Sequence, residues 1–169
     1  MRHTLITLVT VLVISPALAQ GLPTVPDDRI TPGKPWSTDP AEICSDQAGP
    51  NETCEPSHHC GTIGSYSKRH RHTTASEKQA AYDAYGIDRA GRDFEVDHRI
   101  PLCPGGGDVA ENRWPQEGWQ HPSFHDKDRL EAELCRQVCN NGVSLRAAQQ
   151  IFLGDWTVGY EQIYGEPPQ

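Results

Sequence analysis

Six cysteines in a short chain constrain this fold more than any other sequence feature. All six lie beyond the apolar N-terminal segment of the 169-residue chain: Cys44, Cys54, Cys60, Cys103, Cys135 and Cys139. An even number of cysteines behind a secretory leader favours disulfides over free thiols, although the sequence does not choose among the pairings. Cys135 and Cys139 are one helical turn apart, so we expect them to bond to different partners rather than to each other.

The N-terminal segment has the layout of a secretory signal. Arg2 supplies the positive charge, the run from Leu5 to Ile14 is apolar, and Ala17-Leu18-Ala19 is a small-residue cleavage motif. Residues 1–19 are therefore predicted to be a signal peptide. The alternative is a membrane anchor, but the apolar run is too short to span a bilayer. We expect a secreted or periplasmic protein with no stable membrane association after cleavage.

The charge balance excludes one class of nucleic-acid-binding protein. The chain carries 15 Lys and Arg against 23 Asp and Glu, a net charge of −8, and loses Arg2 with the leader. A protein that coats DNA without sequence preference carries a global basic excess. The basic stretch 68–72 (Lys-Arg-His-Arg-His) could still face phosphate, or it could be a solvated turn.

The distribution of prolines, helix caps and apolar periodicity predicts an irregular arm followed by one α+β domain. Residues 20–59 are rich in proline and lack apolar periodicity, whereas residues 60–165 carry capping and periodicity signals. Thr74 and Ser123 each begin a capping box, and Ser144 is a further N-cap. The expected elements are a helix over 74–85, a strand over 94–96, a loop over 99–111, a strand over 112–114 stopped by Pro115, a helix over 123–139, and a last helix from 144 towards 156.

The chemistry-bearing residues gather around the first predicted strand. Asp97 and His98 come at its end, before a loop that contains Gly105-Gly106-Gly107. Adjacent strand residues point to opposite sides, so both can reach one site only if the strand ends or bends there, and we expect the loop to provide that bend. Asp is a ligand for Mg²⁺, Mn²⁺ or Zn²⁺, and His98 can accept a proton from water. Asn112 could orient that histidine.

These residues carry a resemblance to a known family. The run 94–116, with Glu-Val-Asp-His, Ile-Pro-Leu, Gly-Gly and Asn-x-Trp-Pro-Gln, resembles the HNH endonucleases (ββα-metal), most of all a secreted bacterial branch. The likeness extends over residues 60–160. It implies a small ββα-metal core with flanking helices, braced here by disulfides. It also implies Asp97 as a metal ligand, His98 as the general base and Asn112 as the residue that orders the loop and holds His98.

The resemblance leaves the ligand on the following helix open. Ser123 and Phe124 stand where Asn or His is expected, so His125, and after it His121, are the candidate metal ligands. The implied activity is metal-dependent hydrolysis of phosphodiester bonds in DNA, or in RNA, with Mg²⁺ or Mn²⁺ favoured and Zn²⁺ as the alternative. Four cations are candidate phosphate contacts, each with an alternative as an ordinary exposed charge: Arg99, Arg113, Lys127 and Arg129.

Two other interpretations of the sequence compete with the nuclease prediction. The first is a secreted binding module that keeps the scaffold without catalysis, which the uncertain helix ligand and the acidic charge favour. The second is a zinc cluster at Cys54, His58, His59 and Cys60, although disulfides are the default outside the cytosol. The tryptophans Trp114, Trp119 and Trp156 are expected to pack in the interior rather than stack on bases.

Overall fold

The computed structural model describes residues 24–45, 67, 70–88 and 93–169. The predicted signal peptide, the basic residues 68 and 69, and the Cys54–Cys60 segment lie outside these residues, so the zinc reading is not addressed. Within the described part of the chain, no helix is both long and apolar enough to cross a membrane. The described part mixes helices with one small antiparallel sheet.

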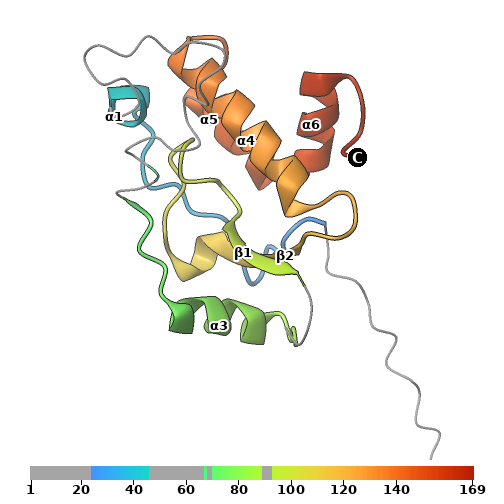
Figure 1. Cartoon of the computed structure of the whole chain (residues 1–169). Coiled ribbons are helices and arrows are strands. Elements are labelled where there is room, and N and C mark those ends of the chain that lie inside the picture. Colours follow the sequence, from blue (N-terminus) through green and yellow to red (C-terminus); the bar gives the residue numbers. More distant parts are fainter. Residues whose placement is uncertain (1–23, 46–66, 68–69, 89–92) are drawn as a thin grey trace, which may run out of the picture.

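The sheet has two strands and lies between helices on both faces. Strands β1 (Phe94–His98) and β2 (Arg113–Glu117) are antiparallel, with Asp97 opposite Trp114 and His98 opposite Arg113. Helix α3 (Ala75–Ala84) lies on one side of the sheet, and the longer helix α4 (Phe124–Cys139) lies on the other (Figure 1). Consecutive side chains of β1 therefore face different helices.

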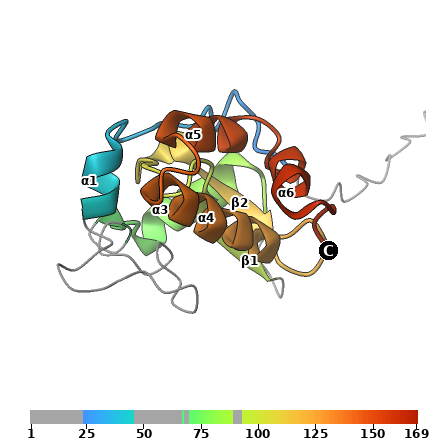
Figure 2. The ribbon, with the colours of Figure 1, turned by 90° about the horizontal axis from the view of Figure 1, so that it is seen from above.

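The C-terminal helices and one helix of the arm form the hydrophobic core. These are α1 (Pro40–Ser45), α4 (Phe124–Cys139), α5 (Leu145–Leu153) and α6 (Trp156–Tyr164), with α1 and α6 at opposite ends (Figure 2). The predicted apolar face of α4 is buried. The core consists of Ile43, Leu130, Leu134, Val138, Leu145, Ala148, Phe152, Trp156 and Tyr160.

Local capping signals fix where two helices begin. The Thr74 hydroxyl accepts from the Glu77 amide at 3.3 Å and the Glu77 carboxylate accepts from the Thr74 amide at 2.8 Å. Ser123 and Asp126 form the equivalent box at the start of α4. Both capping predictions are confirmed, because this motif satisfies amides that have no partner inside the helix.

Three sequence-based boundaries were wrong, the first being the end of β1, which continues to His98 instead of ending at residue 96. Pro115 lies inside β2, opposite Val96, rather than ending it. An edge strand tolerates proline because half of its N–H groups point away from the partner. The last predicted helix is two helices, because Gly154 ends α5 and Asp155 caps α6 by accepting from the Thr157 amide.

The arm is more structured than its proline content predicted. It contains α1, and Ile43 on that helix is 1% exposed. Pro35 forms a β-bridge with Gly106, and the Trp156 indole donates to the Thr24 carbonyl at 2.9 Å. Contacts made far along the sequence therefore order this segment where local propensity does not.

Two disulfides join the arm and the loop to α4. Cys44 of α1 bonds to Cys139, and Cys103 of the loop after β1 bonds to Cys135. The predictions of disulfides, and of separate partners for Cys135 and Cys139, are confirmed. Cys54 and Cys60 lie outside the described residues.

Candidate functional site

Asp97 and His98 lie on opposite faces of the sheet. Both remain within β1, so the strand does not bend to bring them to one point. Asp97 contacts Lys127 of α4, whereas His98 contacts Asp108 of the loop between the strands. The prediction that the strand ends before this pair and lets both side chains reach one site was wrong, because the regular pairing with β2 continues through His98.

His98 is a buried histidine held through one ring nitrogen. Its Nε2 lies 2.9 Å from Asp108 Oδ1, and the two side chains are 2% and 7% exposed. An ionised carboxylate only accepts hydrogen bonds, so this contact places the imidazole proton on Nε2 when the ring is neutral. His98 Nδ1 then carries the lone pair, and it is a buried atom without a hydrogen-bond partner among the described residues.

Asp108 is held ionised by the groups around it. Burial alone would raise its pKa, but hydrogen bonds from His98, the Thr73 hydroxyl and the His72 amide together lower that pKa well below its usual value. Arg113 Nη1 adds an ion pair at 3.3 Å. The fixed negative charge supports the orientation of His98.

Asn112 holds the loop rather than the imidazole. Its amide oxygen accepts from the Ile100 N–H at 2.9 Å, and its amide nitrogen donates to the carbonyls of Ile100 and Gly107 at 2.8 and 2.9 Å. The Asn112 side chain is fully buried. It closes the loop directly after His98, and none of its described hydrogen bonds goes to the ring of His98.

The three glycines of the loop serve close packing. Their amides donate to the carbonyls of Leu102, Pro101 and Lys34, in the order Gly105, Gly106 and Gly107. A Cβ at Gly106 would lie 1.8 Å from the Ile100 carbonyl oxygen, so only glycine fits there. These amides are therefore not available as a phosphate cradle.

On the other face, Asp97 is paired with a buried lysine. The Lys127 ammonium donates to Asp97 Oδ2, and the two side chains are 1% and 7% exposed. Burial would raise the pKa of Asp97, but the charge and hydrogen bond of Lys127, with the neighbouring His98, lower it. The ion pair therefore satisfies the carboxylate that the family resemblance assigns to a metal.

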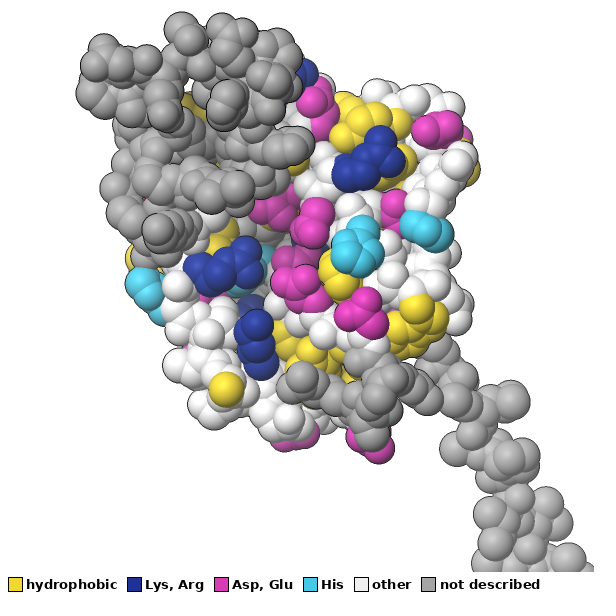
Figure 3. Space-filling view, in the orientation of Figure 1, with side chains coloured by type: hydrophobic (Ala, Val, Ile, Leu, Met, Phe, Trp, Pro, Cys, Tyr) yellow, Lys and Arg dark blue, Asp and Glu magenta, His cyan; other side chains and the backbone are white. Residues whose placement is uncertain are grey.

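Further carboxyl groups surround this ion pair. Burial and the charge of Asp97 raise the pKa of Asp128 to about 6. Burial likewise raises the pKa of Glu131 to about 8, against the opposing charge of Lys127, and burial also raises that of Glu95. Figure 3 shows acidic side chains gathered at the centre of the face seen in Figure 1. One lysine thus faces several carboxyl groups.

The predicted metal ligands do not form a metal-binding group. The His121 Nδ1 lies 2.7 Å from Asp126 Oδ2, and the His125 ring packs against Phe124 at 4.1 Å between centroids. Within the described residues, no three His, Cys, Asp or Glu side chains are placed to hold one metal ion. The arrangement of the described residues around Asp97 therefore does not fit a metal ion.

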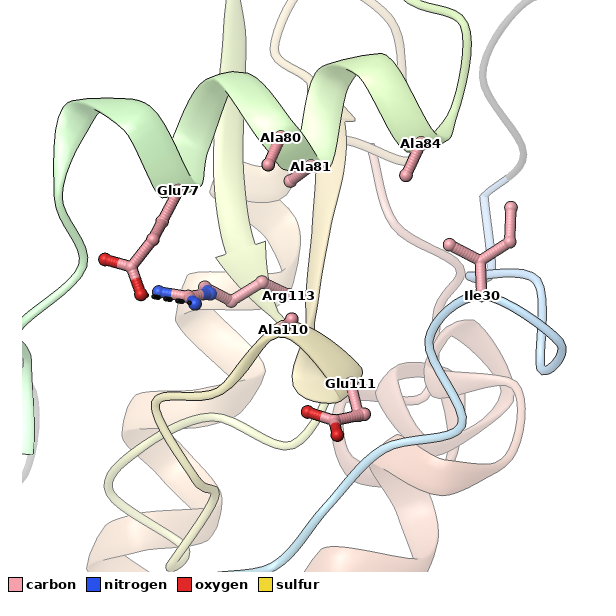
Figure 4. Close-up of a pocket in the computed structure, with 8 residues that line it drawn as sticks. All are labelled: Ile30, Glu77, Ala80, Ala81, Ala84, Ala110, Glu111 and Arg113. Atoms are coloured by element: carbon pink, nitrogen blue, oxygen red, sulfur yellow. Dashed lines mark hydrogen bonds and ion pairs between the residues drawn. The ribbon is translucent and has the colours of Figure 1, made fainter.

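Three of the four candidate phosphate contacts point inward. Arg99 donates to the Thr31 and Leu153 carbonyls, and Lys127 binds Asp97. Arg113 reaches Glu77 of α3 at 3.0 Å, beside a 290 Å³ hollow along the alanines of that helix (Figure 4). Arg129 is exposed and stacks over Tyr160 and Tyr164. Arg99, Arg113 and Lys127 therefore do not present the exposed positive charge that contact with a phosphate requires.

A smaller hollow lies on the outer side of Asp108. It has a volume of about 250 Å³ and is lined by Trp36, His70, His72, Gly106 and Asp108. The Asp108 carboxylate thus connects this hollow to the buried His98. Of the tryptophans expected in the interior, Trp114 and Trp156 are buried, whereas Trp119 is 43% exposed.

Sequence reasoning missed two residues of this site. Asp108 follows the glycine triplet directly, and that position next to a candidate base was the available signal. Glu131 lies one helical turn after Lys127, a spacing that brings the two side chains together. Comparison with protein-family models, with curated proteins and with solved structures finds no match to the chain.

Proposed function

We propose that the chain is a secreted nuclease of the HNH type that hydrolyses phosphodiester bonds of DNA or RNA with little sequence preference. The observation that carries the proposal is His98: one ring nitrogen is fixed by an ionised Asp108, and the other is buried with no hydrogen-bond partner in the described part of the chain. Buried polar atoms without partners are rare and often mark sites of chemistry. The order β1, loop, β2, α4 supports the ββα core that the resemblance implies.

In this proposal His98 is the general base. Its Nδ1 accepts a proton from the attacking water, while Nε2–H remains bonded to Asp108. The negative charge of Asp108 then stabilises the imidazolium that forms. Asn112 is a positioning residue, because it fixes the loop that carries Asp108 relative to the end of β1.

The divalent metal that the resemblance implies stays a prediction. When bound, such an ion would neutralise charge on the phosphate. The resemblance assigns Asp97, with His125 or His121, to hold it, whereas Asp97 is paired with Lys127 in this structure. The chain's own residues described above orient the base and do not depend on that ion.

Plasmid nicking by the oxidised, leader-free protein tests the proposal. The assay is run with EDTA, Mg²⁺, Mn²⁺ and Zn²⁺ in parallel. His98→Gln should abolish cleavage, and Asp108→Asn should lower it at least tenfold, because a neutral amide no longer fixes the tautomer. Asp83→Asn, an exposed Asp-to-Asn change on α3, is the matched control and should cut as wild type does. Melting curves establish that each variant is folded.

Each outcome assigns the residues. Full activity in folded His98→Gln removes His98 from the mechanism. Loss of metal response in His125→Ala or His121→Ala identifies the helix ligand, and cleavage in EDTA refutes the metal requirement.

A non-catalytic binding module is the second candidate. The Asp97–Lys127 ion pair favours it, because the carboxylate expected to hold a metal is already satisfied. If the folded wild-type protein binds polynucleotide but does not cut it with EDTA, Mg²⁺, Mn²⁺ or Zn²⁺, this candidate is established and the nuclease is refuted.

A further inference from the structure

We propose that Trp36 and the hollow beside Asp108 bind an unpaired base of a single-stranded polynucleotide. The inference rests on the proposed function and names its substrate class. Trp36 is 63% exposed, the largest exposure among the large hydrophobic side chains described. Its ring lies 6.2 Å from that of His70, with the planes tilted by 54°.

The backbone that carries Trp36 is firmly anchored although its side chain is exposed. The Trp36 amide donates to the Gly105 carbonyl at 2.7 Å, and Gly107 donates to the Lys34 carbonyl at 2.8 Å. Pro35 between them forms the bridge with Gly106. An indole kept in water on a rigid support is a preorganised surface for stacking, which a collapsed hydrophobic side chain would not provide.

The size of the hollow suits one planar ring. Its volume of about 250 Å³ is below the roughly 300–1,000 Å³ of sites for drug-sized ligands. Stacking on an indole needs a free base face, and bases inside a duplex are already stacked on both faces. The hollow therefore favours single strands over duplexes.

The charges at the rim suit a polyanion. Lys34, two residues before Trp36, and His72, which lines the hollow, are both exposed. The negative charge of the acidic wall, Asp108, is offset by its ion pair with Arg113. A nucleobase stacked on Trp36 would place the adjoining phosphate next to the residues that hold His98, the proposed general base.

Oligonucleotide binding measures this directly. Fluorescence anisotropy of labelled 12-nucleotide DNA and RNA single strands, and of the DNA duplex, gives dissociation constants in EDTA, with strand integrity checked on a gel. Trp36→Ala should weaken single-strand binding about tenfold, the scale of one stacked base. Trp36→Phe should keep most of the affinity. Trp119→Ala removes the other exposed indole, which packs edge-on against Phe94 at 4.8 Å, and should change binding less than twofold.

The outcomes separate this inference from the nuclease proposal. Equal affinities for wild type and Trp36→Ala, equal losses in Trp36→Ala and Trp119→Ala, or a preference for duplex would overturn the stacking site even if the protein cuts DNA. Trp36-dependent single-strand binding by a protein that cuts nothing would support the site and refute the nuclease. The relative affinities for DNA and RNA identify which polynucleotide the hollow prefers.

Discussion

Replacing Lys127 by methionine should destabilise the protein much more than replacing its partner Asp97 by asparagine. Lys127 is 1% exposed and is the cation facing Asp97, with Glu131 and Asp128 close by. Lys127→Met keeps the side-chain length but leaves Asp97 as an uncompensated buried charge. Breaking a buried pair in this way costs about 3–5 kcal/mol.

Asp97→Asn should cost only about 1–2 kcal/mol, near the low end for a lost charge-assisted hydrogen bond. The charge of Asp97 is one reason that the pKa of Glu131 stands at about 8. Once that charge is gone, Glu131 can ionise and become the partner of Lys127. The lysine therefore has a substitute partner, whereas Asp97 has no second ion-pair partner among the described residues.

Urea denaturation at pH 7.5 and pH 5.5 measures both free energies of unfolding. Lys78→Met, the same change at an exposed position on α3, is the matched control and should stay within about 0.5 kcal/mol of wild type. The deficit of Lys127→Met should shrink at pH 5.5, because protonation removes the uncompensated negative charge. Equal costs for the two variants, or a cost below about 1 kcal/mol for Lys127→Met, would refute the reasoning.

Three further predictions concern pH, the loop and the disulfides. Because burial raises the pKa of Glu131 to about 8, the folded state binds its proton more tightly than the unfolded state, and the free energy of unfolding falls as the pH rises from about 5 to 8. Glu131→Gln should flatten this pH dependence in thermal melts by up to about 1.4 kcal/mol per pH unit. The control Glu133→Gln should leave the pH dependence unchanged in this range. Asn112→Asp sets a carboxylate against two carbonyls 2.8 and 2.9 Å away and should cost about 3 kcal/mol or more in urea, with Asn112→Ala costing less; an equal or smaller loss for the aspartate would contradict this account of the loop. Removing Cys44–Cys139, which spans 95 residues, should cost about 4–5 kcal/mol of stability, and removing Cys103–Cys135, which spans 32, about 3–4 kcal/mol. Calorimetry of the two paired serine variants measures which loss is larger. A larger loss for the shorter loop would count against the loop-entropy argument.

Local signals in the sequence determined the elements but not all their limits. The capping boxes at Thr74 and Ser123 and the apolar spacing of Leu130, Leu134 and Val138 predicted α3 and α4 correctly, because these signals act within one or two helical turns. Pro115 was wrongly predicted to end the strand, because a proline interrupts pairing only where its missing N–H would face the neighbouring strand. The order of the arm was missed since its contacts, such as Trp156 with Thr24, come from more than a hundred residues away.

For the candidate site, the sequence by itself determined which chemical groups lie near β1 and that the cysteines form disulfides. Only the tertiary structure decided which groups meet. Strand alternation sent Asp97 to Lys127 and His98 to Asp108, and burial turned Arg99, Arg113 and Lys127 from candidate phosphate contacts into internal partners. A residue's type is fixed by the sequence, whereas its partner, exposure and protonation depend on chain segments brought together by folding.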